Sequence, residues 1–120
     1  MWADMVDSGL KKKETQAFYA KFYAYDTYLV IHHAYQRSYL KLLGARMKIS
    51  TLEDEIVRGS EDNKIYSKLK SAKNEYRIAE RNFLEIRRQR LNTKSAFDEA
   101  QAEHNICRAA IYEQRYAVIR

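Results

Sequence analysis

Four basic side chains lie close together in the stretch IRRQRLNTK, residues 86–94: Arg87, Arg88, Arg90 and Lys94. Guanidinium and ammonium groups gathered in this way could bind phosphate groups or the carboxylates of an acidic partner. The alternative is a solvated helix face on which the Arg90 side chain lies along an apolar contact and keeps its guanidinium in water. We retain these residues as a candidate contact for phosphate or for an acidic partner.

A histidine and the single cysteine of the chain form a second candidate. His104 and Cys107 are three residues apart, which on a helix would place two potential metal ligands on adjacent turns. Two ligands do not make a zinc site, and the sequence contains no Cys-x-x-Cys, His-Glu-x-x-His or Glu-x-x-His motif and no glycine-rich phosphate loop. We therefore predict no metal, no cofactor and no catalytic residues, and a protein that is not an enzyme.

Aromatic residues are concentrated in FYAKFYAYDTY, residues 18–28, which contains six rings in eleven residues. Base stacking would require basic residues interleaved with the rings, and only Lys21 interrupts them. A helix lying on a membrane would require one polar face, whereas apolar residues here fall on several sides of a helix. Packing against other helices remains, either as a core built with Tyr or as an interface with another chain. The candidate partner-binding residues of this stretch are Phe18, Phe22, Tyr25 and Tyr28.

The composition predicts an all-α chain. Its 120 residues include no Pro and only three Gly, so the residues that break helices and form β-turns are nearly missing. The net charge of +6 is modest and spread over both halves of the sequence. No window holds enough consecutive apolar residues for a membrane-spanning helix, and a single Cys excludes an internal disulfide. We expect a cytoplasmic protein, with the matrix of an organelle left open for a mature form.

Residues from Ile65 to Val118 repeat with alternating spacings of four and three. Twelve of the sixteen positions are apolar, counting Tyr and Cys, and the flanking positions are mostly charged. Such a repeat keeps one stripe of a helix facing a partner helix, as in a coiled coil. The positions are Ile65, Leu69, Ala72, Tyr76, Ala79, Phe83, Ile86, Arg90, Thr93, Phe97, Ala100, His104, Cys107, Ile111, Gln114 and Val118.

Three helices are predicted, over residues 10–49, 51–58 and 61–119. Ser50 and Glu53 form a capping box that would start the short second helix, and Gly59 would end it. Ser60 would cap the third helix. The face of the first helix that we expect to meet the later repeat contains Phe18, Phe22, Tyr25, Leu29, His32, Gln36, Leu40, Leu43 and Met47.

These elements predict an elongated helical hairpin with a long coiled-coil C-terminal helix, forming a single domain over residues 1–120. A first helix of about 40 residues laid antiparallel on one of about 59 would leave roughly the last 20 residues unpaired. Exposed apolar residues in that tail would mark an interaction site, unless the N-terminal segment with Trp2, Met5 and Val6 covers them. Because the first helix is apolar on several sides, we expect the hairpin to be part of an oligomeric bundle. The candidate partner-binding residues of the tail are Ile111, Tyr112, Tyr116 and Val118.

The functional prediction is a non-enzymatic α-helical coiled-coil interaction protein, acting as an adaptor, a regulator or a structural subunit of a larger assembly. Its partner would be another protein chain or further copies of itself, bound through the coiled coil. The alternative is a small basic nucleic-acid-binding protein that places Lys11, Lys12, Lys13 and the basic residues of 87–94 against phosphates. No transmembrane segment is predicted.

Overall fold

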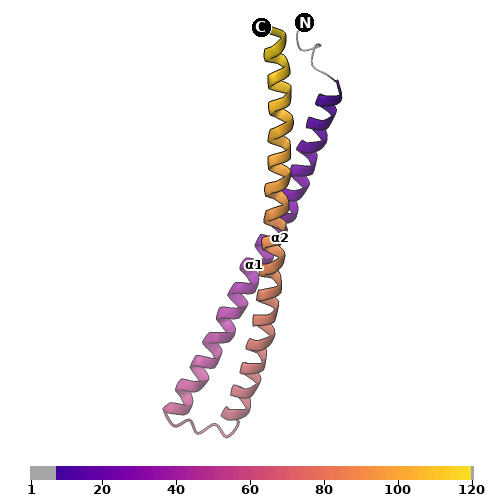
Figure 1. Ribbon diagram of the computed structural model, residues 1–120. Coiled ribbons are helices and arrows are strands. Elements are labelled where there is room, and N and C mark those ends of the chain that lie inside the picture. The colour runs from indigo at the N-terminus through magenta and orange to yellow at the C-terminus, as the bar shows by residue number, and fades with distance from the viewer. Residues whose placement is uncertain (1–7, 120) are drawn as a thin grey trace. The chain divides into compact units, whose positions relative to one another are not determined.

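The computed structural model describes residues 8–119, and the side chains of residues 8–116. Two helices, α1 (Ser8–Val57) and α2 (Ile65–Ile119), are joined by a turn over residues 58–64 (Figure 1). Within residues 8–119 there is no strand. The prediction of an all-α helical hairpin with a long C-terminal helix is therefore confirmed.

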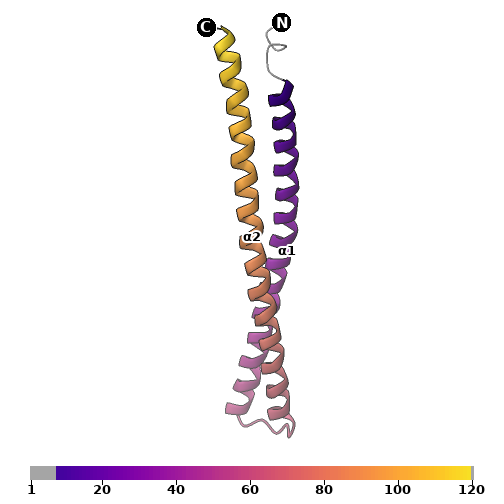
Figure 2. The same ribbon diagram turned by 45° about the vertical axis from the view of Figure 1, so that its right-hand side comes forward.

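The chain packs as two compact units. We call residues 31–90 the turn unit, and residues 1–30 together with 91–120 the terminal unit. In each unit a segment of α1 lies beside an antiparallel segment of α2 (Figures 1 and 2). Both helices run unbroken from one unit into the other.

The repeat predicted in the C-terminal half is the contact stripe of α2, which we call the α2 seam. Every position of the repeat from Ile65 to Gln114 is buried or half-buried, and the side chain of Val118 lies outside the described residues. In the turn unit, Ile65 and Ala72 form a buried cluster with Leu52 of α1. The coiled-coil prediction is confirmed for these positions, because a 3.5-residue period keeps them turned toward the partner helix.

The face predicted for α1 is wrong by about one position. Its buried and half-buried stripe runs through Ala17 and Lys21, whereas Phe22, Leu40 and Met47 of the predicted face are exposed. We call the observed stripe the α1 seam. It contains Glu14, Ala17, Lys21, Ala24, Tyr28, Ile31, Tyr35, Ser38, Leu42, Ala45, Ile49, Leu52 and Ile56.

Side-chain size explains which stripe of α1 is used. The α2 seam carries Tyr76, Phe83 and Phe97, whose rings need room between the helix axes. The α1 seam supplies that room with small residues such as Ala24 and Ser38. Facing positions that alternate large and small side chains pack more closely than two rows of rings. The aromatic row of α1 is therefore displaced to the edge of the contact.

One antiparallel register describes the contacts within both units. Each contact joins a residue at the edge of the α1 seam to a residue of the α2 seam, and successive contacts are seven residues apart on each helix. In the terminal unit the pairs are Phe18 with His104 and Tyr25 with Phe97, and in the turn unit they are His32 with Arg90, Tyr39 with Phe83, and Arg46 with Tyr76. The Phe83 ring also lies 5.3 Å from the Tyr35 ring, so it sits between side chains of successive α1 turns. This arrangement is knobs-into-holes packing.

The predicted break at Ser50 does not occur, and residues 51–57 belong to α1. Inside this continuous helix the Thr51 hydroxyl donates to the carbonyl of Met47 at 2.9 Å. Leu52 is buried and Ile56 is half-buried against the core of the turn unit. Tertiary packing of that stripe outweighs the local capping signal at Ser50, since packing supplies most of a helix's stability in a protein.

The predicted helix stop at Gly59 is confirmed. Gly59 has a φ of 78°, and its amide donates to the carbonyl of Ile56 at 3.1 Å. The Ser60 amide donates to the carbonyl of Glu55 at 3.0 Å. These two bonds and the left-handed glycine form a Schellman motif, which satisfies the last carbonyls of α1.

The predicted start of the second long helix is four residues too early, because α2 begins at Ile65. Asp62, rather than Ser60, provides the cap: its carboxylate accepts the Lys64 amide at 2.9 Å and the Lys68 ammonium at 2.6 Å. The hydrogen bond from Lys68 lowers the pKa of Asp62 most, and the bond from the Lys64 amide lowers it further. The Ser60 hydroxyl accepts only the amide of Asp62, within the turn.

The prediction that about the last 20 residues are unpaired is also wrong. Because α1 begins at Ser8 and extends to Val57, its terminal-unit segment pairs with most of the C-terminal part of α2. Glu14 contacts His104, and Thr15 lines the same cavity as Ile111. The N-terminal residues Trp2, Met5 and Val6, predicted to cover the tail, lie outside the described residues.

The two glycines of this region allow a paired test of the helix boundaries. Nothing lies within 4 Å of a Cβ added at Gly44, which is inside α1, so Gly44→Ala should raise the free energy of unfolding by about 0.5–1 kcal/mol. Gly59→Ala should lower it by about 1–2 kcal/mol, because a Cβ is strained at positive φ. Urea unfolding followed by circular dichroism measures both values. Destabilisation by Gly44→Ala, or no effect of Gly59→Ala, would contradict the boundaries described above.

Candidate interaction surfaces

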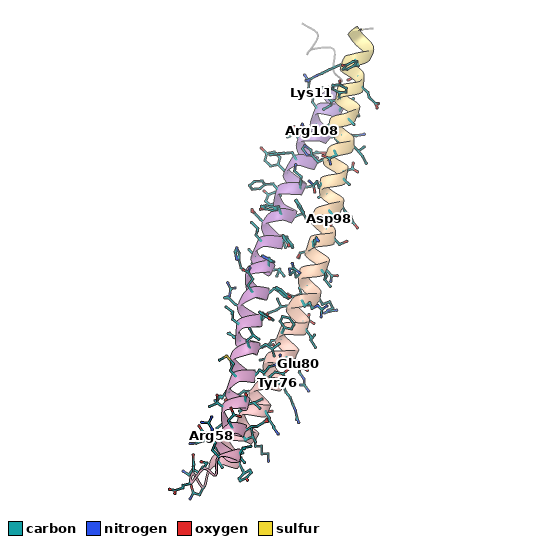
Figure 3. The ribbon with its side chains drawn as sticks, turned by 90° about the vertical axis from the view of Figure 1, so that its left-hand side faces the viewer. Lys11, Arg58, Tyr76, Glu80, Asp98 and Arg108 are labelled. Atoms are coloured by element: carbon teal, nitrogen blue, oxygen red, sulfur yellow. The ribbon has the colours of Figure 1, made fainter. Side chains whose placement is uncertain are left out.

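A group of rings on the terminal unit stays outside the seam. Phe18, Tyr19, Phe22, Tyr23 and Tyr25, which we call the aromatic surface, are all exposed, Phe22 by 53% and Tyr23 by 71%. Figure 3 shows ring side chains that point away from α2 on the segment of α1 at the level of Arg108 and Asp98. Single exposed rings are common on protein surfaces, but five within eight residues form a contiguous group. This is the largest aromatic group among the described residues of the terminal unit.

The inner members of the aromatic surface are held in place by the seam. The Phe18 ring lies edge-on to the His104 ring at 5.7 Å, and the Tyr25 ring lies 5.3 Å from the Phe97 ring. Phe18 and Tyr25 nevertheless each keep 42% of their surface exposed. Phe18 also contacts Phe22, with 6.5 Å between ring centroids. These contacts restrict the rotamers of the inner rings, so a partner would meet a partly preorganised surface.

The other predicted partner-binding residues differ in their placement. Tyr28 and Ile111 are half-buried seam residues rather than surface groups. Tyr112 and Tyr116 are exposed, and their rings lie 4.6 Å apart. A hydrogen bond between their hydroxyls raises the pKa of Tyr112. Val118 lies in α2, and its side chain is outside the described residues.

A polar network crosses the seam at His104, whose side chain is almost completely buried. His104 Nε2 lies 2.7 Å from a carboxylate oxygen of Glu14, and Nδ1 lies 3.0 Å from the Lys21 ammonium. The ammonium group can only donate, so Nδ1 accepts its hydrogen bond and Nε2 carries the proton that is donated to Glu14. Glu14 and Lys21 were not singled out from the sequence, because the sequence did not determine which stripe of α1 faces α2.

His104 and Cys107, the candidate ligand pair of the sequence, both contact other side chains of the terminal unit. Both ring nitrogens of His104 have partners within the chain. Cys107 is buried, and its sulfur lies 3.9 Å from a carboxylate oxygen of Glu103. Residues 8–119 contain no group of three or more His, Cys, Asp or Glu residues that could hold a metal ion. The two residues serve the packing of the terminal unit.

The four basic residues of 87–94 differ in their contacts. Arg90 turns into the seam, where its Nε donates to His32 Nδ1 at 3.0 Å and its guanidinium lies 4.7 Å from the centre of the Tyr35 ring. Arg88 pairs with Glu85 at 2.7 Å, and Arg87 is exposed. These arginines belong to the turn unit, whereas Lys94 is an exposed residue of the terminal unit.

The two units differ in net charge, although the sequence shows only a modest excess along its length. Residues 31–90 contain fourteen basic and eight acidic residues, while residues 1–30 and 91–120 together contain eight of each. The whole net charge of +6 therefore belongs to the turn unit. The aromatic surface belongs to the unit with no net charge.

Two substitutions at His104 test the polar network. His104→Leu removes both hydrogen bonds and leaves Glu14 and Lys21 without their shared partner, so the free energy of unfolding should fall by about 1–3 kcal/mol. His104→Gln can still accept from Lys21 and donate to Glu14, and should cost clearly less. Thermal and urea unfolding compare the two variants. Equal losses would show that the ring fills space and that its hydrogen bonds contribute little.

Within residues 8–119, neither helix has an apolar stretch of the length that a membrane crossing requires. No protein-family model matches the chain. No curated protein and no solved structure matches it significantly.

Proposed function

We propose that this protein is a non-enzymatic coiled-coil interaction protein that binds other protein chains through its aromatic surface, as an adaptor, a regulator or a structural subunit of a larger assembly. The proposal has one main support: the outer rings of the aromatic surface take no part in the contact between α1 and α2. The α2 seam is buried or half-buried from Ile65 to Gln114, yet Phe22 and Tyr23 remain more than half exposed.

The chemistry of the aromatic surface suits a protein partner. Tyr and Phe are enriched in protein interfaces, where they bury large areas with few rotatable bonds. Lys21, the one charged residue among the rings, is turned toward His104, with its ammonium 5.7 Å from the centre of the Phe18 ring. Asp26 and Thr27, both exposed, border the rings and provide a polar rim.

The absence of net charge on the terminal unit favours association between like chains. Residues 1–30 and 91–120 have equal numbers of basic and acidic groups, so two copies meeting through this unit would not bring two positive fields together. The turn unit, with its charge of +6, would repel a second turn unit. A second copy of the chain, bound at the aromatic surface, is therefore the first partner to test.

Replacing Phe22 and Tyr19 with Glu tests the proposal. Glu is a good helix former, so circular dichroism should show unchanged helix content. Sedimentation should show that the parent chain associates as its concentration rises. The double variant should associate at least about 30-fold more weakly, because central aromatic residues of an interface often contribute 2 kcal/mol or more.

The matched control is Ile78→Glu. Ile78 is exposed by 54%, close to the value for Phe22, but it lies on α2 in the turn unit, whereas the aromatic surface belongs to the terminal unit. This variant should associate like the parent chain. The proposal fails if the parent chain is monomeric at every concentration and a photo-crosslinker at residue 22 forms no protein adduct in extracts of cells that make the protein.

A further inference from the structure

A second surface of different character lies on α2 in the turn unit. Residues at spacings of four, three, four, four, three and four fall within one sector of the helix, beside the α2 seam. All of them are exposed. We call this sector the basic stripe, and it contains Tyr66, Lys70, Lys73, Arg77, Arg81, Leu84 and Arg88.

Four cations of the basic stripe form no ion pair with another described residue. Among the described residues, Lys70, Lys73, Arg77 and Arg81 have no ion-pair partner, whereas Arg88 pairs with Glu85. Three carboxylates lie beside the stripe: Glu75 is bound to Lys48 of α1 at 3.2 Å, Glu85 is bound to Arg88 at 2.7 Å, and Glu80 follows Arg77 by three residues. The stripe thus presents a row of positive charge with no carboxylate inside it.

Part of the stripe borders a hollow that suits an anion. Its volume is about 530 Å³, and no acidic residue lines it. Lys70, Lys73 and Arg77 supply positive charge, while Ser71 and Asn74 add uncharged hydrogen-bond donors. Tyr66, 69% exposed, stands at one end of the hollow.

The character of the stripe distinguishes between classes of anionic partner. The centre of a protein interface is depleted in Lys and is apolar, but the centre of this stripe, from Lys70 to Arg81, consists of cations. A membrane-surface helix would place a large apolar face beside its cations, whereas the apolar seam of α2 is already covered by α1. A phosphate backbone requires a row of cations, which the stripe provides, and a base of a single strand can stack on an exposed ring such as that of Tyr66.

We propose that the basic stripe binds the phosphate backbone of a nucleic acid, with the Tyr66 ring stacking on a base of a single strand. From Lys70 to Arg88 the stripe is about 27 Å long at a rise of 1.5 Å per residue. It can therefore follow several successive phosphates of one strand. This site is distinct from Lys11, Lys12, Lys13 and Lys94 of the terminal unit, and it does not depend on the proposed role of the aromatic surface.

Fluorescence anisotropy with a labelled single-stranded oligonucleotide, measured over a range of salt concentrations, tests the site. Replacing Lys70, Lys73 and Arg77 with Gln should weaken binding about 10- to 100-fold at low salt. It should also reduce the slope of log K against log salt by about 2, since each phosphate contact on a single strand contributes about 0.7. Tyr66→Ala should weaken single-strand binding about 5- to 150-fold and leave duplex binding nearly unchanged.

The matched control replaces Lys12, Lys13 and Lys94 with Gln, which removes the same charge from exposed positions of the terminal unit. Binding by this variant should stay within about threefold of the parent value. Equal weakening by both triple variants would overturn the site, because it would indicate a response to net charge alone.

Two further outcomes would also overturn the proposal. One is the absence of binding by single strands and duplexes at low salt. The other is tighter binding of polyglutamate than of an oligonucleotide of equal charge, which would identify an acidic protein as the partner. The Phe22 and Tyr19 double variant should bind the oligonucleotide like the parent, so failure at one surface can be distinguished from failure at the other.

Discussion

Two helices can bury only one stripe each against the other, and the surface of this protein follows from that limit. The α1 and α2 seams take up the available contact, and within the described residues no large side chain is completely buried. Apolar residues outside the seams, including Phe22, Tyr23 and Ile78, therefore stay in contact with water. A protein that carries so many apolar groups on two sides of a helix is suited to burying them against another chain.

Polar side chains at the seam favour one register of the two helices. Leu and Ile side chains tolerate a slip of one heptad, but His104 finds Glu14 and Lys21 only in the observed register. Arg90 and His32 impose the same register within the turn unit. A slip would leave these groups buried without partners, which costs more than the lost packing of an alkyl side chain.

The separation of charge from aromatic surface gives the two units different prospective partners. The terminal unit combines zero net charge with five exposed rings, which suits association with protein. The turn unit carries all of the net positive charge, and much of it lies along one sector of α2 that is free of carboxylates. A polyanion would be drawn to that sector by long-range attraction that salt screens.

The sequence by itself determined the helical class, the α2 seam and the helix stop at Gly59. A 3.5-residue repeat and a glycine after a helix have the same consequence wherever the chain folds. It could not determine which stripe of α1 meets α2, because the aromatic row at Phe18, Phe22 and Tyr25 is more hydrophobic than the row at Ala17, Lys21 and Ala24. Which stripe of α1 packs against α2 depends on the rings of the α2 seam, which need small side chains opposite them. The deciding quantity is therefore the space between the two helices and not the hydrophobicity of α1 alone. For the same reason, the tertiary structure was needed to identify the partners of His104 and the position of Arg90 in the seam, because the contacting residues are distant in sequence. It was also needed to show that the residues of the basic stripe are exposed on one side of α2.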